Sequence, residues 1–405
     1  MPVRATKRGA ERTPLNGRFD VLICGASFAG LAVARELAGS GASVLVIDRY
    51  EIGERQTSAC AAPTEWLTNL GLDASIKQTF DALVVHAPKR TERWPLPFTF
   101  STFDYRTLCA LLAEQGDFAF ETAKVEGIRR GTEDHVVVTD RGELTAPLVV
   151  DALGWRRVLG TLHGDRVQPP EATLSRGLEV HPHGNGTDLE LWLDRRYVTS
   201  GYSWSFPADG ELRVGVGSFD PRFHVKDPTL ALARDVEVDA VRFQGNWIPH
   251  ALRPAVEDGV FFTGDSAGHC LPTTAEGIRT ALYFGLACGR ELRAVIEGRK
   301  TREQALAGYA AFSDGHERPF RLLKRAQDLV GHVVGRERLL RAVLRVLSTR
   351  RLLDWFFGKY LAVAPPEFAL GSGNDGQPAA ERAAGAPVLE ADADDRVHAA
   401  GAREA

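Results

Sequence analysis

The chain has 405 residues, of which 44% are hydrophobic and 25% charged, and its formal net charge is −4. These values are typical of a globular protein large enough for two joined domains. The weak negative charge excludes a general affinity for nucleic acid, because that binding needs a basic surface excess. No apolar run reaches the roughly 18 residues of a membrane-spanning helix, and no signal peptide is expected.

Cysteine usage favours a reducing compartment. The five cysteines include no Cys-x-x-Cys pair, so neither a disulfide framework nor a metal site is expected. His181, His183 and His269 have no ligand spacing and are interpreted as ordinary residues. The cytoplasm is therefore the predicted location.

The folded body is predicted to start with a βαβ unit. Residues 1–18 and 369–405 are rich in Ala, Gly, Pro and charge without hydrophobic periodicity, which predicts disorder. The segment after residue 18 reads FDVLIC, then a helical pattern GLAVARELAGSG, then the apolar run ASVLVID. Parallel strands joined by a helix indicate a Rossmann-type nucleotide-binding domain with a buried sheet.

Later segments alternate between this pattern and β-rich stretches. We predict an α/β fold in which a discontinuous nucleotide-binding domain is interleaved with a β-sheet substrate domain. The nucleotide-binding segments are 19–78, 103–160 and 251–300, the substrate segments are 79–102 and 161–250, and a helical region spans 301–368. A long amphipathic helix is expected over 275–296.

The first motif lies between the first strand and its helix. It comprises Gly25, Ala26, Ser27, Phe28, Ala29 and Gly30. Gly25 permits a tight turn, and Gly30 lets helix and strand approach, so that the helix N-terminus presents free N–H groups to a pyrophosphate. Asp48 ends the second strand, where it would accept hydrogen bonds from ribose hydroxyls, and Arg49 follows it. The alternative is a glycine turn that binds nothing.

Two further motifs follow in order. Asp151-Ala152-Leu153-Gly154 precedes Thr263-Gly264-Asp265-Ser266-Ala267-Gly268, and Glu276-Gly277-Ile278 comes shortly afterwards. Together with the first motif they resemble the glutathione-reductase-type, p-hydroxybenzoate-hydroxylase-like flavoproteins, which include aromatic hydroxylases, flavin halogenases and geranylgeranyl reductases.

That resemblance implies non-covalent FAD. It assigns the ribityl chain to Asp265, next to Gly264, and it directs the helix start at Gly277 and Ile278 toward the flavin pyrimidine edge. A helix N-terminus stabilises the negative charge of reduced flavin there. Arg106 resembles an arginine that contacts FAD; alternatively, it is a solvated charge at a helix end.

A third motif resembles a signature of geranylgeranyl reductases. Tyr202-Ser203-Trp204-Ser205-Phe206-Pro207 is followed by Val214-Gly215-Val216-Gly217. Alternate residues of a strand share one face, so Tyr202, Trp204 and Phe206 form a single aromatic stripe. The stripe alone is equally typical of a core, and the resemblance favours the wall of a substrate pocket. Thr199 and Ala275 depart from the family pattern, which affects the substrate assignment.

Cys60 is predicted to be catalytic, because its segment supplies a substrate-side residue near the flavin of related reductases. The alternative is a small, inert core residue. Reactivity would need a lowered thiol pKa.

The resemblance implies an FAD-dependent oxidoreductase that reduces C=C bonds of a prenyl lipid by hydride transfer from flavin N5. No second Gly-x-Gly-x-x-Gly unit is present, so NAD(P)H or a ferredoxin is expected as an external electron donor. One alternative is an FAD-dependent monooxygenase of a small aromatic substrate. Another is a non-catalytic flavoprotein that escorts a lipidated partner.

The C-terminal helical region has a basic, apolar segment at 318–360. It contains eleven Lys or Arg residues against three acidic ones, interleaved with Leu, Val, Trp and Phe at helical spacing. This pattern indicates peripheral contact with an anionic membrane. The alternative is that the apolar face packs on the flavin domain and the basic residues are solvated.

Overall fold

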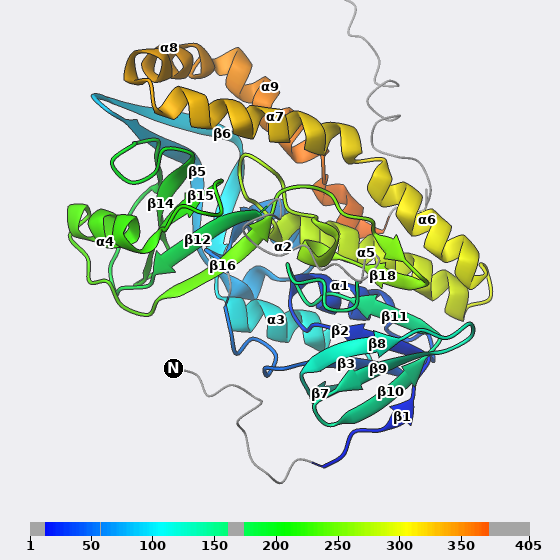
Figure 1. Cartoon of the computed structure of the whole chain (residues 1–405). Helices are drawn as coiled ribbons and strands as arrows, with labels where there is room; N and C mark the ends of the chain where they lie inside the picture. The colour runs from blue at the N-terminus through cyan, green and yellow to red at the C-terminus, as the bar shows by residue number, and fades with distance from the viewer. Residues whose placement is uncertain (1–12, 57, 161–173, 372–405) are drawn as a thin grey trace, which may run out of the picture. The chain divides into compact units, whose positions relative to one another are not determined.

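The computed structural model describes residues 13–56, 58–160 and 174–371 (Figure 1). Most of the two predicted disordered termini, 1–12 and 372–405, lies outside the described residues. Residues 13–18 are nevertheless described, and Gly17–Arg18 pairs in parallel with a strand at Gly142–Ala146. The described chain thus enters its first sheet before residue 19.

The nucleotide-binding region is a six-stranded sheet whose strands run parallel except for β17. Its order is β17 (Val256–Glu257), β18 (Val260–Phe262), β11 (Leu148–Asp151), β2 (Val21–Cys24), β3 (Val44–Asp48) and β7 (Ala119–Thr122). All four residues of β2 are buried, as expected for a parallel strand covered on both faces. The predicted Rossmann-type α/β fold is confirmed.

The second sheet has eight strands. Its order is β16 (Gln244–Pro249), β12 (Leu174–Val180), β15 (Leu212–Ser218), β14 (Gly201–Pro207), β13 (Leu189–Trp192), β5 (Ile76–Ala87), β6 (Arg90–Phe103) and β4 (Ala61–Pro63). The predicted substrate segments supply most of it, although β4 comes from within 19–78. The division into two domains stays a prediction.

The third sheet has four strands. Its order is β1 (Gly17–Arg18), β10 (Gly142–Ala146), β9 (His135–Thr139) and β8 (Val125–Arg129). β8, β9 and β10 are joined antiparallel in sequence order, as the short strands and charged turns of this stretch predict.

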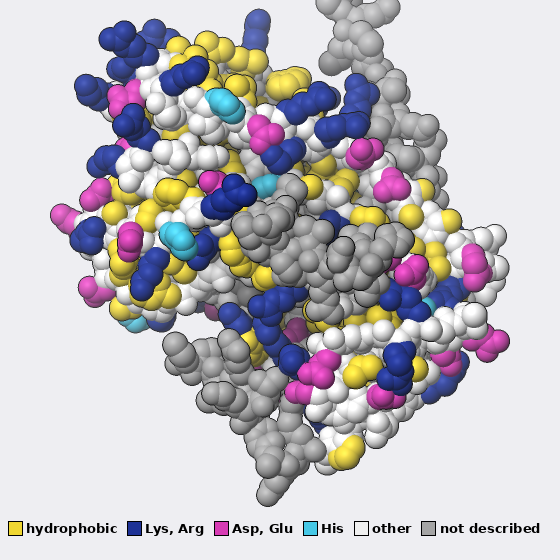
Figure 2. All heavy atoms as spheres, viewed as in Figure 1, with side chains coloured by type: hydrophobic (Ala, Val, Ile, Leu, Met, Phe, Trp, Pro, Cys, Tyr) yellow, Lys and Arg dark blue, Asp and Glu magenta, His cyan; other side chains and the backbone are white. Residues whose placement is uncertain are grey.

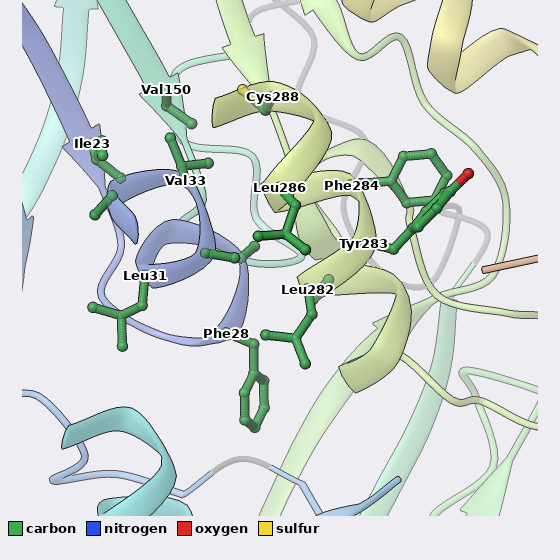
Figure 3. Packing of buried hydrophobic residues seen from close by; sticks show 14 of the residues in the cluster. Ile23, Phe28, Leu31, Val33, Val150, Leu282, Tyr283, Phe284, Leu286 and Cys288 are labelled. Carbon is green, nitrogen blue, oxygen red and sulfur yellow. The ribbon is translucent and has the colours of Figure 1, made fainter. Parts of the chain in front are cut away.

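Helices α1 (Phe28–Glu36) and α5 (Ile278–Ile296) cross closely above the six-stranded sheet. A Cβ on Gly285 would lie 2.6 Å from the Ala29 carbonyl oxygen, and one on Gly289 would lie 2.9 Å from the Val33 carbonyl oxygen. Figure 3 shows Leu282 and Leu286 of α5 pointing toward α1. The order of these contacts means that the helices run parallel, with both N-termini at one end.

The long helix begins later than residue 275. Leu271 and Glu276 form an isolated antiparallel bridge, and Thr273 and Ala275 have φ values of 70° and 50°. Left-handed backbone interrupts helical hydrogen bonding, so α5 begins at Ile278 with Gly277 as its N-cap. The loop before it is therefore a defined structural feature.

The other helices surround the sheets. They are α2 (Thr64–Asn69), α3 (Tyr105–Glu114), α4 (Lys226–Asp235), α6 (Arg302–Asp314), α7 (Glu317–Val334), α8 (Glu337–Leu347) and α9 (Arg350–Ala362), with 3-10 turns η2 (Asp73–Ser75), η4 (Gly264–Ala267) and η5 (Pro366–Leu370). Across 13–56, 58–160 and 174–371, no helix is both long and apolar enough to cross a membrane.

Helices α7, α8 and α9 lie beside β5 and β6 (Figure 1). Val85 of β5 packs with Val333, Leu340 and Leu344, so part of the apolar face of this helical region is buried. Figure 2 shows dark-blue basic side chains next to yellow apolar ones at the top of the view, where α7 and α8 lie. The region therefore has both packed and exposed apolar residues.

Candidate active site

One cavity of about 1630 Å³ connects the parallel sheet, the eight-stranded sheet and the C-terminal helices. Drug-sized ligands occupy pockets of roughly 300–1,000 Å³, so this volume exceeds the need of a single small molecule. Asp48 and Asp265 line it on the side of the parallel sheet, and Leu344 and Leu352 line it on the side of α8 and α9. The cavity thus joins a polar region to an apolar one.

The predicted phosphate turn has the backbone that a glycine motif requires. Gly25 has φ +115°, and a Cβ there would overlap the Ala152 carbonyl oxygen. A Cβ on Gly30 would overlap the Gly25 carbonyl oxygen. Ser27 is the N-cap of α1, and its hydroxyl accepts a hydrogen bond from Tyr105 Oη at 3.1 Å. Both glycines therefore let the turn pack against neighbouring backbone, and Ser27 and Phe28 at the N-terminus of α1 line the cavity.

Asp48 is anchored to this turn. Its Oδ2 accepts from Ala26 N at 2.9 Å and its Oδ1 from Tyr50 N at 3.0 Å, while burial raises its pKa. Arg49 lines the cavity beside it, 4.9 Å from the centre of the Tyr50 ring. Phe28 and Ala29 of the predicted turn also line the cavity, whereas Gly25, Ala26 and Gly30 are absent from its lining.

Asp265 lies where the two helix N-termini meet. A Cβ on Gly264 would lie 2.9 Å from Ala29 Cβ of α1 and 3.9 Å from Ala281 Cβ of α5. A Cβ on Gly277 would lie 3.6 Å from Asp265 Oδ1. Burial raises the pKa of Asp265 to about 6, although the Arg253 guanidinium lowers it. Gly264, Gly277 and Ile278 all line the cavity.

Asp151 ties the motifs together, a role that its sequence position alone did not reveal. Its buried carboxylate accepts from Ser266 Oγ at 2.7 Å, from Leu159 N at 2.7 Å and from Leu153 N at 2.9 Å. The Thr263–Gly268 motif is thereby held against Asp151–Gly154, and the close approach of Gly25 to Ala152 brings the glycine turn to the same place.

The aromatic stripe of β14 faces the same cavity. Tyr202, Trp204 and Phe206 are half-buried and line it, whereas Ser203 and Ser205 on the other face are buried. Tyr202 Oη donates to the Thr274 carbonyl oxygen, which connects β14 to the loop before α5. The stripe therefore adjoins the Asp265 end of the cavity.

The Trp204 ring packs against glycine residues of the neighbouring strands. Gly215 and Gly217 pair with Trp204 and Tyr202 across β14 and β15, and Gly177 pairs with Gly217 from β12. A Cβ on Gly215 would overlap the indole, and one on Gly217 would lie 3.3 Å from Trp204 Cζ3. The Val-Gly-Val-Gly pattern thus leaves room for a flat aromatic side chain on the sheet.

Two predicted site residues outside the glycine turn are also absent from the cavity lining. Cys60 is 0% exposed and absent from the described cavity lining; its Sγ contacts the Ser58 carbonyl oxygen at 3.2 Å. Burial raises its thiol pKa well above the ordinary value, which opposes thiolate formation. Arg106 is exposed on α3, is likewise absent from that lining, and backs onto Gly53. The geometry supports neither predicted role.

The loop before α5 is fixed by a buried arginine that the sequence did not suggest. Arg279 is 0% exposed; it donates to Glu276 and to the Tyr360 and Ala364 carbonyl oxygens. Tyr360 Oη also donates to Glu276 Oε2 at 3.2 Å. The end of α9 therefore braces the cavity loop.

Comparisons with known proteins agree with this geometry. A family model described as "Lycopene cyclase protein" matches residues 20–200. Digeranylgeranylglycerophospholipid reductase 3 of Methanosphaera stadtmanae is 25% identical over 73% of this chain and 83% of its own length.

Solved structures resemble the chain in fold. A geranylgeranyl bacteriochlorophyll reductase-like protein from Thermoplasma acidophilum has a TM-score of 0.75 at 18% identity, covering 87% of this chain and 98% of the other. A probable FAD-dependent monooxygenase from Pseudomonas aeruginosa has a TM-score of 0.59 at 18% identity, covering 84% and 100%.

The fold is that of FAD-dependent oxidoreductases, and the site is similar in its arrangement. The glycine turn that a Cβ would fill and the acidic residue between two helix N-termini fit the dinucleotide cofactor of this class. The chain is, more particularly, similar to digeranylgeranylglycerophospholipid reductases in sequence and to a geranylgeranyl bacteriochlorophyll reductase-like protein in fold.

We expect Gly30→Trp to purify without flavin colour, because its side chain would fill the phosphate turn. A matched control is Gly358→Ala, since a Cβ on Gly358 meets no atom within 4 Å. Flavin absorbance per protein, measured on preparations with normal circular dichroism, checks the prediction. Full flavin content in folded Gly30→Trp would refute the assignment of the turn.

Proposed function

We propose that this protein reduces carbon–carbon double bonds of a prenyl lipid with non-covalent FAD as its redox cofactor. The single cavity that runs from Asp265 to Leu352 carries the proposal. Its apolar arm includes Val85, Phe98 and Phe356. Polyprenyl chains bind largely through apolar area removed from water, which suits such an arm. The names of the relatives from Methanosphaera and Thermoplasma support the same substrate class.

The residues proposed to hold FAD surround the polar region of the cavity. The turn Gly25–Gly30 would receive the pyrophosphate, Asp48 and Arg49 the adenosine, and Asp265 the ribityl chain. When bound, FAD supplies the hydride that the alkene accepts. Gly277 and Ile278 at the start of α5 would stabilise negative charge on the reduced ring without an ionisable group.

The chain's own residues would position the lipid and exclude water. Trp204 and Phe206 offer a flat apolar wall, and the C-terminal helices close the cavity over β5 and β6. Reduction of an unactivated alkene depends on alignment in a dry pocket, so positioning would supply much of the rate. We propose NAD(P)H or a ferredoxin as the external electron donor that reduces the flavin.

The direct test is anaerobic photoreduction of the yellow protein, followed by addition of a polyprenyl lipid or its saturated counterpart. We expect the unsaturated lipid alone to restore oxidised flavin absorbance. Reoxidation that needs oxygen, together with NAD(P)H oxidation stimulated by a phenol, would instead indicate a monooxygenase. Failure to retain FAD would indicate a non-catalytic escort.

Trp204 gives a second prediction. If it lines the substrate site, Trp204→Ala should raise KM or lower turnover for a prenyl lipid while flavin stays bound. If it serves only as core, the same change should cost about 3–5 kcal/mol of stability. Thermal melting and steady-state kinetics on one preparation separate the two roles. A large fall in Tm with normal specific activity would refute the role in substrate binding.

We also propose that the protein draws its lipid from an anionic membrane through the α7–α9 surface, defined here by Leu322, Leu329, Val346, Leu352 and Trp355. These residues are 63%, 63%, 57%, 38% and 61% exposed, respectively. Leu329 and Leu352 also line the cavity, so this surface adjoins its apolar arm. A lipid tail could therefore pass from the surface into the cavity.

Basic side chains accompany this surface. Lys324 and Arg350 pair with Asp328 and Asp354 on their own helices, which reduces their free charge. Among the described residues no ion-pair partner is found for a set of exposed arginines, Arg325, Arg336, Arg338, Arg345 and Arg351. Each basic residue near an anionic leaflet contributes on the order of 1 kcal/mol, which salt screens.

Vesicle co-sedimentation tests the membrane proposal. We expect binding to phosphatidylserine-containing vesicles at low salt, loss at high salt, and none to neutral vesicles. Trp355→Ser should weaken binding, whereas the control Leu370→Ser, at a residue 64% exposed in η5, should not. Absence of binding to anionic vesicles at low salt would rule out the contact.

A further inference from the structure

A buried carboxylate lies beside Trp204 on the cavity side of the eight-stranded sheet. Glu179 of β12 is 3% exposed and lines the cavity. Its Oε2 accepts from Trp204 Nε1 at 3.1 Å, and its Oε1 accepts from Gln244 Nε2 at 2.7 Å. His181 Nε2 contacts the same Oε1 at 2.9 Å. The carboxylate is therefore held in place by three neighbours.

Strand register explains why Trp204 reaches this carboxylate. Glu179 pairs with Gly215 of β15, and Gly215 pairs in turn with Trp204 of β14. Gly215, between Glu179 and Trp204, has no side chain, and a Cβ on it would lie 2.7 Å from Glu179 Cβ. The indole therefore lies across β15 and brings its N–H to Glu179.

His181 connects Glu179 to a second carboxylate nearer the surface. It is 6% exposed, and its Nδ1 lies 3.2 Å from Glu211 Oε1. The Glu211 side chain is 24% exposed and also pairs with Arg213 and with Arg242. Glu179, His181 and Glu211 thus form a continuous chain of polar contacts from the cavity toward solvent.

The charges around His181 favour its protonated form. Burial lowers its pKa, but the hydrogen bonds and charges of Glu179 and Glu211 outweigh burial and raise the pKa to about 9. Burial opposes ionisation of Glu211 too, yet contacts with His181 and Arg213 bring its pKa down to about 2. At neutral pH a proton is therefore stored on His181, one hydrogen bond away from Glu179.

Other acidic groups at this part of the cavity are already engaged. Tyr202 Oη donates to the Thr274 carbonyl oxygen, and burial raises its pKa above the ordinary value. Glu276 is bound by Arg279 and Tyr360. Cys60 is 0% exposed and lies outside the described cavity lining. Glu179 also has partners, but it lines the cavity beside Trp204 and contacts His181, which can supply a proton.

We propose that Glu179 is the proton donor of the reduction and that His181 is the positioning residue that resupplies its proton. This inference rests on the proposed function. Bound reduced flavin would supply a hydride, and with it two electrons, to one alkene carbon. The π electron pair would take a proton at the other carbon from Glu179, which has received that proton from His181. Glu179 would then be a carboxylate, and His181 a neutral imidazole.

The proton would reach Glu179 before that step, along its existing contact of 2.9 Å with His181. His181 would regain a proton from solvent past Glu211, so that each turnover consumes one solvent proton. General acid catalysis of this kind contributes typically about 10²–10⁴-fold to a rate. The polar cluster is thereby connected to the reaction as well as to the packing of Trp204.

The isosteric variant Glu179→Gln tests the proposal. We expect normal flavin content and photoreduction but reoxidation by a polyprenyl lipid at least about a hundredfold slower in a single anaerobic turnover. Glu190→Gln is a matched control, because Glu190 makes a similar contact with His86 at 3.2 Å and is absent from the described cavity lining. It should react at the wild-type rate.

The pH profile gives an independent readout. His181 holds its proton below its folded-state pKa, so the wild-type reoxidation rate should fall as pH rises through about 9. His181→Gln should lose that alkaline limb, whatever its stability. The proposal would be overturned if His181→Gln kept the alkaline fall in rate, or if Glu179→Gln were reoxidised at the wild-type rate. If Glu179→Gln does not fold, the pH profile of His181→Gln decides. Failure of the proposed function itself would appear as no reoxidation of wild type by any prenyl lipid.

Discussion

The close crossing of α1 and α5 is the constraint on which the site depends. Gly285 and Gly289 let α5 rest on the backbone of α1, where any side chain would hold the helices apart. Because the helices run parallel, both N-termini reach Gly264 and Asp265. Two sets of free N–H groups thereby converge at one end of the cavity, and the local field favours an anionic cofactor. A larger residue at the crossing would therefore displace the N-termini of both helices from the cavity.

A second close approach creates the substrate wall. The glycines of β12 and β15 let Trp204 lie flat on the sheet, which leaves its ring toward the cavity and its N–H toward Glu179. The same side chain thus contributes apolar area and fixes a polar group. The apolar arm under α7, α8 and α9 continues this wall, so that one cavity can serve an anionic dinucleotide and an apolar chain.

Much of the predicted nucleotide-binding part of the cavity can be read from the sequence, because its residues lie in short motifs at the ends of strands. Gly25, Gly30 and Asp48 follow strand and helix boundaries that hydrophobic periodicity reveals, and Asp265 follows another such strand. The sequence predicts too early a start for α5, since no propensity indicates that Thr273 and Ala275 adopt left-handed backbone. The Glu179–Trp204 contact depends on the register of three strands far apart in sequence, which composition and spacing do not determine. The resemblance predicts a catalytic Cys60, but the side chain is fully buried, and burial is a tertiary property that the sequence does not reveal.

The most direct measurement is the mass of a polyprenyl lipid after a single anaerobic turnover with the photoreduced protein. We expect each equivalent of reduced flavin to add two hydrogen atoms to the lipid, one as a hydride from the flavin and one as a proton from Glu179. A lipid recovered at its original mass while the flavin stays reduced would contradict it. A product that has gained an oxygen atom, formed only when air is admitted, would contradict it as well.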